Sequence, residues 1–302
     1  MSTYRLDKLF SPRSVAVVGA SPRETSPGRA VLTNLRAAGF EGSVSLVNPH
    51  YDEIEGIKAV KTIQELPQAP DLLVIATPPQ SVPGIVASAG KKGAATAVII
   101  TAGLGHAEGS LADACEKAAR ATGLRLVGPN CLGVLSSRVK LNASFAARMP
   151  PAGELALVSQ SGAITAGLIE WSAAHDIGFS AAVSLGDKVD VDFGDLLDFF
   201  ALDGATRAIL LYIESVNNAR KLCRRRALPL ASSPWWWSSP AAMRKEPRRR
   251  RRTPARSPVL TRSTTPRLDA PVCCGCSIST SYSPRRRRSG GYGRFPANGW
   301  RY

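Results

Sequence analysis

The stretch SVAVVGASPRETSPG, residues 14–28, contains an apolar β-type run, a glycine turn and the start of a helix. Four similar runs follow, and helices fit between them at about 28–38, 80–92 and 109–122; the runs are 43–49, 71–79, 96–104 and 124–130. Runs that are apolar at nearly every position and alternate with helices indicate a parallel sheet covered on both faces. With right-handed crossovers, the pattern predicts a doubly wound, Rossmann-like α/β domain over residues 1–145.

A second α/β unit follows a polar break. The break at 136–153 carries Pro150-Pro151 and predicts an interdomain connection. Apolar runs then resume at 154–162, 178–187 and 207–215, with helices ending near 175 and 202. Because only three strands precede the end of the pattern, we expect an incomplete flavodoxin-like domain over residues 146–221.

Charge divides the chain into two unlike parts. Residues 222–302 hold 19 of the 39 Lys and Arg residues and two of the 23 Asp and Glu residues. Residues 1–221 hold the other 20 basic and 21 acidic side chains and are therefore close to neutral. The net charge of +16 thus belongs to the basic segment, and the α/β part is not a nucleic-acid binder by its charge.

The basic, low-complexity segment 222–302 has no apolar periodicity and is expected to be disordered. One interpretation is an Arg-rich RNA-binding arm, and another is solvated low-complexity chain. A third is translation in a neighbouring reading frame. The run WWW at 235–237 has a single possible coding sequence. Read from the third base of each codon, that sequence encodes Val-Val, which is typical of a buried strand. We therefore interpret this segment as out of frame.

Cysteines and apolar runs indicate the compartment. Two lone cysteines in the α/β part, Cys115 and Cys131, are typical of a reducing cytoplasm. The spacing C-C-x-C at 273–276 has no second Cys or His pair at finger spacing, so no metal site is expected. The chain has no apolar run of about 20 residues and no signal-peptide pattern, so a cytoplasmic protein is predicted.

The turn after the first run departs from the G-x-G-x-x-G dinucleotide fingerprint. Gly19 permits close backbone approach, and the turn N–H groups and the Ser21 hydroxyl favour a phosphate near a helix N-terminus. An NAD site would have an acidic residue at the end of the second strand, where this chain has Asn48-Pro49. These residues argue against NAD, although ordinary turns also contain such residues.

The string SQSG, residues 159–162, joins a strand to a helix in the second unit. The hydroxyls of Ser159 and Ser161, the space opened by Gly162 and the helix N-terminus together favour an anion. A serine N-cap explains the same residues equally well.

Several strings together resemble one family. They are SVAVVGAS (14–21), LVNP (46–49), VGPNCLG (127–133), LVSQSGA (157–163), SLGD (184–187) and LLYIES (210–215). Over residues 6–221 the chain resembles the NDP-forming (ADP-forming) acyl-CoA synthetases, relatives of the succinyl-CoA synthetase α subunit. It is most similar to bacterial acetate–CoA ligases that are fused to a GNAT protein acetyltransferase.

The resemblance implies that the first domain binds coenzyme A. Its contacts would be Gly19, Ala20, Ser21 and Pro22 at the phosphate turn, Asn48 and Pro49 near the adenosine, Thr77 and Pro78 after the third strand, and Asn130 after the fifth. In the second domain, Ser159, Gln160, Ser161 and Gly162 would steady a phosphoryl group, and Glu214 would orient a catalytic histidine.

The implied reaction is acyl-CoA + ADP + phosphate ⇌ acid + CoA + ATP. ATP or ADP and Mg would enter only with an ATP-grasp partner domain or subunit. The chain has three histidines, His50, His106 and His175, none followed by the Thr-Gly-Ala of the family, and we predict all three to be ordinary surface or loop residues. The expectation is a CoA-binding portion that is inactive alone. A CoA-binding regulatory module and an RNA-binding protein remain alternatives.

Overall fold

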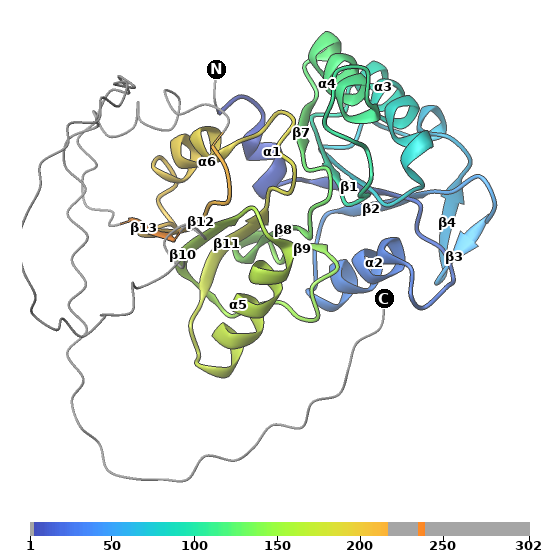
Figure 1. Cartoon of the computed structure of the whole chain (residues 1–302). Helices are drawn as coiled ribbons and strands as arrows, with labels where there is room; N and C mark the ends of the chain where they lie inside the picture. Colours follow the sequence, from blue (N-terminus) through green and yellow to red (C-terminus); the bar gives the residue numbers. More distant parts are fainter. Residues whose placement is uncertain (1–2, 217–234, 239–302) are drawn as a thin grey trace, which may run out of the picture. The chain divides into compact units, whose positions relative to one another are not determined.

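Two β-sheets with their covering helices make up the described part of the chain (Figure 1). The computed structural model describes residues 3–216 and 235–238, all within one compact unit that runs from Met1 to Pro247. The fold begins with a short helix, α1 (Leu6–Phe10), whose Leu6, Leu9 and Phe10 are buried.

The first sheet has seven strands in the order β3-β4-β2-β1-β5-β6-β7. They are β1 (Ser14–Val18), β2 (Ser43–Val47), β3 (Glu53–Ile54), β4 (Ile57–Val60), β5 (Leu72–Ile75), β6 (Thr96–Ile99) and β7 (Arg125–Val127). All neighbours pair in parallel except β3 and β4, a small antiparallel hairpin that sequence reasoning missed. The chain runs from β1 to β2 on one side and then crosses to β5 on the other. The strand order therefore reverses at β1, where open α/β sheets bind their ligands.

Helices cover both faces of this sheet, as the sequence predicted. Helix α2 (Pro27–Ala37) lies on one face, and α3 (Val82–Lys92) and α4 (Leu111–Thr122) lie together on the other (Figure 1). In β1, Val15 and Val17 pack in the core with α2, whereas Ala16 and Val18 pack in the core with α3 and α4. This alternation follows from the two-residue period of a strand, and it requires the continuous apolar run seen at 14–18.

The second sheet has six strands in the order β13-β12-β10-β11-β8-β9. They are β8 (Gly133–Ser136), β9 (Leu141–Ser144), β10 (Ala152–Ser159), β11 (Phe179–Ser184), β12 (Ala208–Tyr212) and β13 (Trp235–Ser238). Helix α5 (Gly162–Ala174) follows β10, and α6 (Phe193–Phe200) follows β11. The three predicted strands, β10, β11 and β12, are parallel, and β8 joins β11 in antiparallel pairing.

The segment 136–153 is more than the connection predicted from its polarity. Residues 136–144 belong to the hairpin β8–β9, which is joined by a 3₁₀ turn at Ser137–Val139 and paired to the second sheet through β8. In β9, the polar Asn142 and Ser144 are buried with hydrogen bonds made: the Ser144 hydroxyl donates to Asn142 Oδ1, and Asn34 Nδ2 of α2 donates to Ser144 O and Ala146 O. A polar composition therefore concealed the buried strand β9.

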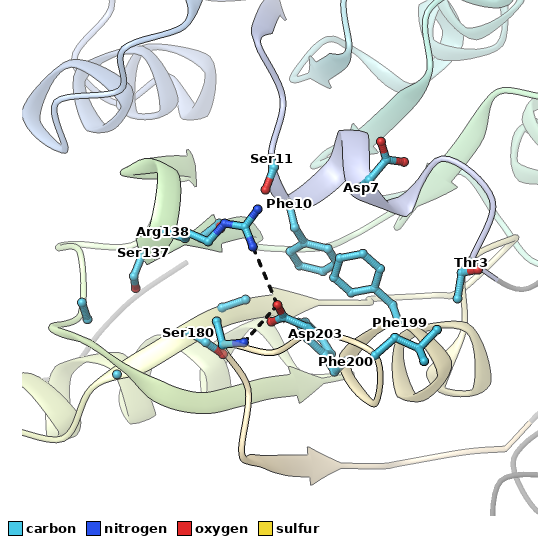
Figure 2. A pocket seen from close by; sticks show the side chains of 16 residues that line it. Thr3, Asp7, Phe10, Ser11, Ser137, Arg138, Ser180, Phe199, Phe200 and Asp203 are labelled. Carbon is cyan, nitrogen blue, oxygen red and sulfur yellow. Dashed lines mark hydrogen bonds and ion pairs between the residues drawn. The ribbon is translucent and has the colours of Figure 1, made fainter. Parts of the chain in front are cut away.

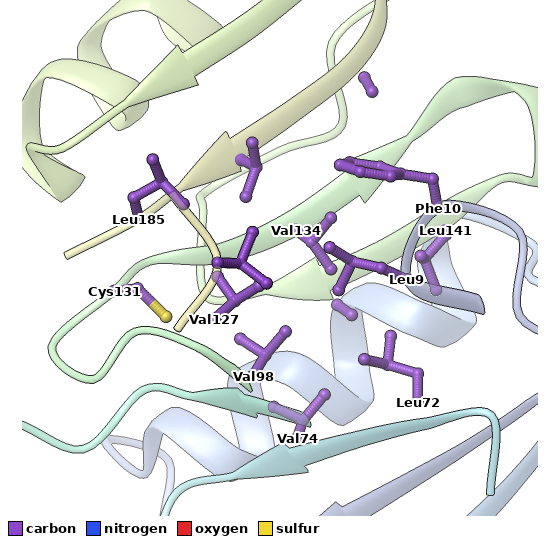
Figure 3. Packing of buried hydrophobic residues seen from close by; sticks show 14 of the residues in the cluster. Leu9, Phe10, Leu72, Val74, Val98, Val127, Cys131, Val134, Leu141 and Leu185 are labelled. Carbon is purple, nitrogen blue, oxygen red and sulfur yellow. The ribbon is translucent and has the colours of Figure 1, made fainter. Parts of the chain in front are cut away.

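One hydrophobic core spans both sheets. Figure 3 shows Val74 and Val98 of the first sheet packed near Val134 and Leu141 of the hairpin, with Leu9 of α1 beside them. Polar contacts join the same two parts, since the Arg125 guanidinium of β7 pairs with Asp190 at 2.9 Å and Asp195 at 3.2 Å. One hydrophobic cluster thus contains residues from both sides of 145, and the domain division there stays a prediction.

The structure corrects one part of the expected disorder in 222–302. Residues 235–238 form β13, which pairs in parallel with β12 over Ile209–Tyr212 and covers that edge of the second sheet. Tryptophan favours strands, and an unpaired edge is a template for a further strand. The remainder of 222–302 lies outside the described residues. Among the helices that the structure describes, none is long and apolar enough to cross a membrane.

Candidate functional site

The turn after β1 is built around Gly19. This residue has φ +93°, and a Cβ on it would lie 2.4 Å from Ala76 O of the turn after β5. Gly28 in the first turn of α2 is equally confined, since a Cβ there would lie 2.7 Å from Gly19 O. Two glycines thus bring the amino end of α2 directly onto the turn, which is the arrangement that presents backbone N–H groups to a phosphate.

The turn after β2 is tied to the turn after β1. Asn48 is 6% exposed; its Nδ2 donates to Ala20 O at 2.6 Å, and its Oδ1 accepts from His50 N at 2.8 Å. The turn after β5 is fixed in a similar way, because the Ser81 hydroxyl bonds to Thr77 Oγ1 at 2.9 Å and to Pro78 O at 2.8 Å. These side chains therefore build the rim of the strand ends.

A cleft of about 970 Å³ opens at these turns. Six of the predicted CoA contacts line it: Gly19, Ser21, Asn48, Pro49, Thr77 and Pro78. Three do not. Ala20 is fully buried behind the turn, and Pro22 accepts a hydrogen bond from Arg29. Asn130 instead donates from its backbone to Thr101 O and reaches toward Asp187 with its side chain.

Further residues line the cleft that sequence reasoning did not select. The exposed cations Arg23 and Lys61 lie at it, together with His50 and Tyr51. Lys61 Nζ pairs with Asp52 at 2.5 Å. The prediction that His50 is an ordinary loop residue is therefore incomplete, because its position after β2 places it on the cleft wall. Arg23 follows Ser21-Pro22 directly, and that proximity was the available signal.

In the second part, the SQSG string forms the end of β10 and the start of α5. Ser161 is the N-cap of α5, and its hydroxyl accepts from Ile164 N at 3.3 Å. The Ser159 hydroxyl is held locally, since it donates to Ser161 O and accepts from Ser161 N. The serine N-cap interpretation is thus confirmed, and it coexists with an open helix N-terminus at Gly162.

A buried hydroxyl at this helix start has no partner among the described residues. Ser184, the last residue of β11, is fully buried and its Oγ makes no hydrogen bond. The same oxygen lies 3.8 Å from the position that a Cβ on Gly162 would take. An unsatisfied buried hydroxyl is costly, so a group that is absent from the structure and that accepts or donates a hydrogen bond fits here.

Glu214 follows β12 and is exposed, and its predicted role of orienting a histidine stays a prediction. Gln160 does not extend toward the helix start; its Oε1 accepts from Glu214 N and Ser215 N, both at 3.0 Å, and its Nε2 donates to Ser215 Oγ at 3.0 Å. Gln160 therefore holds the Glu214 segment, a role different from the predicted phosphate contact.

Neither of the other histidines approaches this segment through a described contact. His175 follows α5 at its carboxyl end, opposite Ser161, where its ring stacks on Trp171. His106 is exposed in the loop before α4. The prediction that these two are surface or loop residues is confirmed.

A second hollow, of about 500 Å³, lies between α1, α6 and the start of β11 (Figure 2). Three phenylalanines pack at its wall: Phe10 stacks on Phe199, and Phe200 meets both rings at an angle. The Asp203 carboxylate there accepts from the Thr206 hydroxyl at 2.7 Å and faces Arg138 at 3.9 Å. These polar groups are bonded within the protein, so the first cleft is the better candidate for a charged ligand.

Within residues 3–216 and 235–238, no group of three or more His, Cys, Asp or Glu side chains is arranged to hold a metal ion. Both described cysteines are free and buried, and burial raises the pKa of Cys115 to about 11 and of Cys131 to about 12.

The fold and the cleft define an α/β protein with a cleft at a strand switch point, and family models match its parts. Residues 13–137 match a CoA binding domain, and residues 152–228 match a succinyl-CoA ligase like flavodoxin domain. Residues 13–228 therefore belong to the family of ADP-forming acyl-CoA synthetases related to succinyl-CoA ligase.

Relatives with established names support this placement. The chain is 40% identical over 222 residues to the ADP-forming acetate–CoA ligase I of Archaeoglobus fulgidus, covering 72% of this chain and 32% of that protein. It is 41% identical over 223 residues to the α subunit of ADP-forming acetate–CoA ligase I of Pyrococcus furiosus, covering 72% of this chain and 48% of the subunit.

A solved structure agrees. The dinucleotide-forming acetyl-coenzyme A synthetase 1 of Ca. Korarchaeum cryptofilum, in complex with phosphate and ADP, superposes with a TM-score of 0.73 and 34% identity over 79% of this chain and 52% of that one. The chain thus spans between about a third and a half of the length of these proteins.

Proposed function

We propose that the first part of the chain binds coenzyme A in the cleft at the ends of β1, β2 and β5. The observation that carries this proposal is the Gly19 turn, which packs against the start of α2 and places Gly19 and Ser21 in the wall of the cleft at the strand switch point. Helix N-termini and glycine turns of this kind bind phosphate, and the cleft volume lies within the range of about 300–1,000 Å³ usual for ligand sites.

The charges of the cleft support a polyanionic ligand. Arg23 lies at its edge, Lys61 lies there with its ammonium paired to Asp52, and no acidic side chain is among its described lining residues. The second-strand end carries Asn48 in place of the carboxylate that would bind the ribose of NAD, and the Asn48 side chain is occupied within the protein. Coenzyme A therefore fits the cleft better than NAD does.

We further propose that the start of α5 is where a phosphoryl group is held in the acyl-CoA synthetase reaction. The orphaned Ser184 hydroxyl, the Gly162 space and the helix N-terminus would hold an anion there, and the Glu214 carboxylate would orient an imidazole supplied to the site. Nucleotide, Mg and an ATP-grasp partner domain or β-type subunit would complete the reaction.

In this proposal, residues 1–302 alone do not turn over. The three histidines are His50, His106 and His175, and none is followed by Thr-Gly-Ala. The orienting carboxylate and the helix N-terminus cannot replace a nucleophile. The second candidate is a CoA-binding module without catalysis, which is also favoured because no histidine is followed by Thr-Gly-Ala. The acyl group, the fused acetyltransferase and the out-of-frame origin of 222–302 remain predictions, and an RNA-binding role would rest on residues outside those described.

Calorimetry on the full chain tests CoA binding. We expect CoA to bind and NAD to bind more weakly or not at all. Ser21→Asp should weaken CoA about tenfold or more, because like charges about 4 Å apart cost ~1 kcal/mol in water and ~4 kcal/mol at a partly buried site. Ser43→Asp, at the opposite end of β2, is the matched control and should leave CoA affinity unchanged. NAD binding tighter than CoA would refute the assignment.

Phosphorylation tests the second part. Incubated with ATP and an ATP-grasp partner, the chain as given should take up no acid-labile phosphate. Label on His50, His106 or His175 would overturn the proposal, and catalytic turnover by the chain alone would exclude both candidates.

A further inference from the structure

The segment 185–191 after β11 links the two sites. Its backbone runs beside the end of the first sheet and forms three hydrogen bonds with it: Asp187 N to Pro129 O at 2.9 Å, Val189 N to Gly128 O at 3.2 Å, and Val191 N to Leu126 O at 3.0 Å. Contact is close, since a Cβ on Gly186 would lie 2.1 Å from Pro129 O. The segment therefore follows any movement of the 128–130 turn.

On the cleft side, that turn is joined to a residue of the cleft wall. Thr101 Oγ1 donates to Thr77 O at 2.7 Å, and Asn130 N donates to Thr101 O at 3.0 Å. Asn130 Nδ2 then reaches Asp187 Oδ1 at 3.4 Å. A continuous series of hydrogen bonds thus runs from Thr77 in the cleft to Asp187 in the segment.

The next residue, Lys188, extends toward the other site. Its Nζ donates to Ser215 O at 2.7 Å and to Ser215 Oγ at 3.0 Å, and it lies 5.4 Å from the centre of the Phe193 ring. The side chain is 5% exposed, and this burial lowers the pKa of the Lys188 ammonium. The carboxylates of Asp192, Glu214 and Asp187 oppose that shift. A buried ammonium is costly, so the contact with Ser215 has to be well formed.

Ser215 is therefore held from two directions. Gln160 bonds its amide N and its hydroxyl, and Lys188 bonds its carbonyl and the same hydroxyl. Glu214 directly precedes this doubly held residue, and its own amide donates to Gln160 Oε1. Loss of the Lys188 anchor would leave the Glu214 carboxylate on a segment tied at one side only.

We propose that Lys188 is a positioning residue for Glu214, and that segment 185–191 couples the ordering of Glu214 to occupancy of the cleft. The inference rests on the proposed binding of coenzyme A. A ligand against Thr77 restricts the Thr101–Asn130–Asp187 series, and Lys188 passes that restriction to Ser215. Coupling of this kind needs no large displacement, because a ligand that orders one segment reduces the cost of ordering the next.

Hydrogen exchange of single amides in the full chain, with and without CoA, tests the proposal. The amides of Glu214 and Ser215 are the reporters, since both donate to Gln160. In the unmodified chain, CoA should slow their exchange about fivefold or more, the lower end of typical coupling between sites. In Lys188→Met, the ratio of the exchange rates without and with CoA should fall close to one. Calorimetry should still find CoA bound to this variant, with an affinity that differs from that of the unmodified chain by no more than the coupling factor.

Two further variants separate positioning from folding. Lys117→Met, an exposed lysine on α4 that pairs with Asp113, should keep the full CoA response. Asp187→Ala leaves the contact between Lys188 and Ser215 in place and should also lose the response of Glu214 and Ser215 to CoA. This variant replaces Lys188→Met as the test if Lys188→Met fails to fold. A merely structural lysine would raise exchange equally with and without CoA and leave the ratio unchanged.

The outcomes are distinguishable. If CoA binds and slows exchange at Gly19 and Ser21 but not at Glu214 and Ser215, the coupling is wrong and CoA binding stands. If Lys188→Met keeps the fivefold ratio, Lys188 is not the link. If CoA does not bind the unmodified chain, the proposed function and this inference fall together.

Discussion

Replacement of Gly19 by alanine should destabilise the protein by about 2–5 kcal/mol. A left-handed backbone such as φ +93° costs a residue with a Cβ about 1–2 kcal/mol. The added methyl would also lie 2.4 Å from Ala76 O and 2.7 Å from Thr77 Cγ2, so β1 and β5 must separate locally, and overpacking of this kind costs roughly 1–3 kcal/mol. Because Ala76 O belongs to the backbone, no side-chain rotation relieves the contact.

Urea denaturation followed by far-UV circular dichroism measures this loss, with an unchanged slope indicating a change in stability alone. Gly84→Ala is the matched control. Gly84 lies in α3 with ordinary helical backbone, and an added methyl would meet nothing within 4 Å, so alanine should stabilise by about 0.5–1 kcal/mol. The two variants should therefore differ in sign. A Gly19→Ala protein as stable as the unmodified chain would refute the close approach of the turn and, with it, the phosphate site.

Three other variants test the packing and the second site. Arg125→Met should lower the free energy of unfolding in urea by about 3–5 kcal/mol, because it removes the ion pair between Arg125 and the buried Asp195 carboxylate. Arg207→Met, which breaks the exposed pair with Glu154, should change stability by less than about 1 kcal/mol. Equal losses in the two variants would contradict this prediction. Burial raises the pKa of Cys131 to about 12 in the folded state, against about 9 in the unfolded state. The contribution of this thiol to stability is therefore complete below pH 9 and is lost as the pH rises above that value, at about 1.4 kcal/mol per pH unit. The stability of Cys131→Ala should decline less steeply between about pH 9 and pH 11 than that of the unmodified chain. Ser184→Ala should raise the free energy of unfolding by about 1 kcal/mol without added anion, since the removed hydroxyl has no partner among the described residues, and Ser159→Ala should lower it; a loss of stability in Ser184→Ala would show that its Oγ is bonded after all.

The sequence was informative wherever burial was complete. In β1, β5 and β6 every residue is buried, so an unbroken apolar run predicted each strand within a few residues. Strand β9 gave no such signal, because its buried Asn142 and Ser144 side chains bond to each other and its backbone at Ser144 O accepts from the distant Asn34 of α2. Tertiary hydrogen bonds therefore set the limit of the prediction for the fold.

The same limit applies to the site. Gly19 was predictable because its conformation depends on the local turn, and six predicted residues do line one cleft. The family resemblance and its place after the fifth strand predicted Asn130 as a CoA contact, whereas its side chain reaches toward Asp187 in the second part of the protein. Lys188 and Ser184 carry no pattern of their own, since a lysine after Gly-Asp is typical of a loop. Their importance arises from contacts with Ser215 and from the space beside Gly162.

Turn chemistry and ligand binding are not competing explanations for the polar residues at these strand ends. The Asn48 side chain uses both of its polar atoms in hydrogen bonds that join two turns. The Thr77 hydroxyl bonds to Ser81 at the start of α3. Such residues shape the rim but have few groups left for a ligand. Within the first turn, Gly19 N donates to Val47 O and Ala20 O accepts from Asn48, so recognition falls above all to the Ser21 hydroxyl and the nearby cation of Arg23. A strand-end motif read from sequence thus locates a site more reliably than it names the atoms that bind.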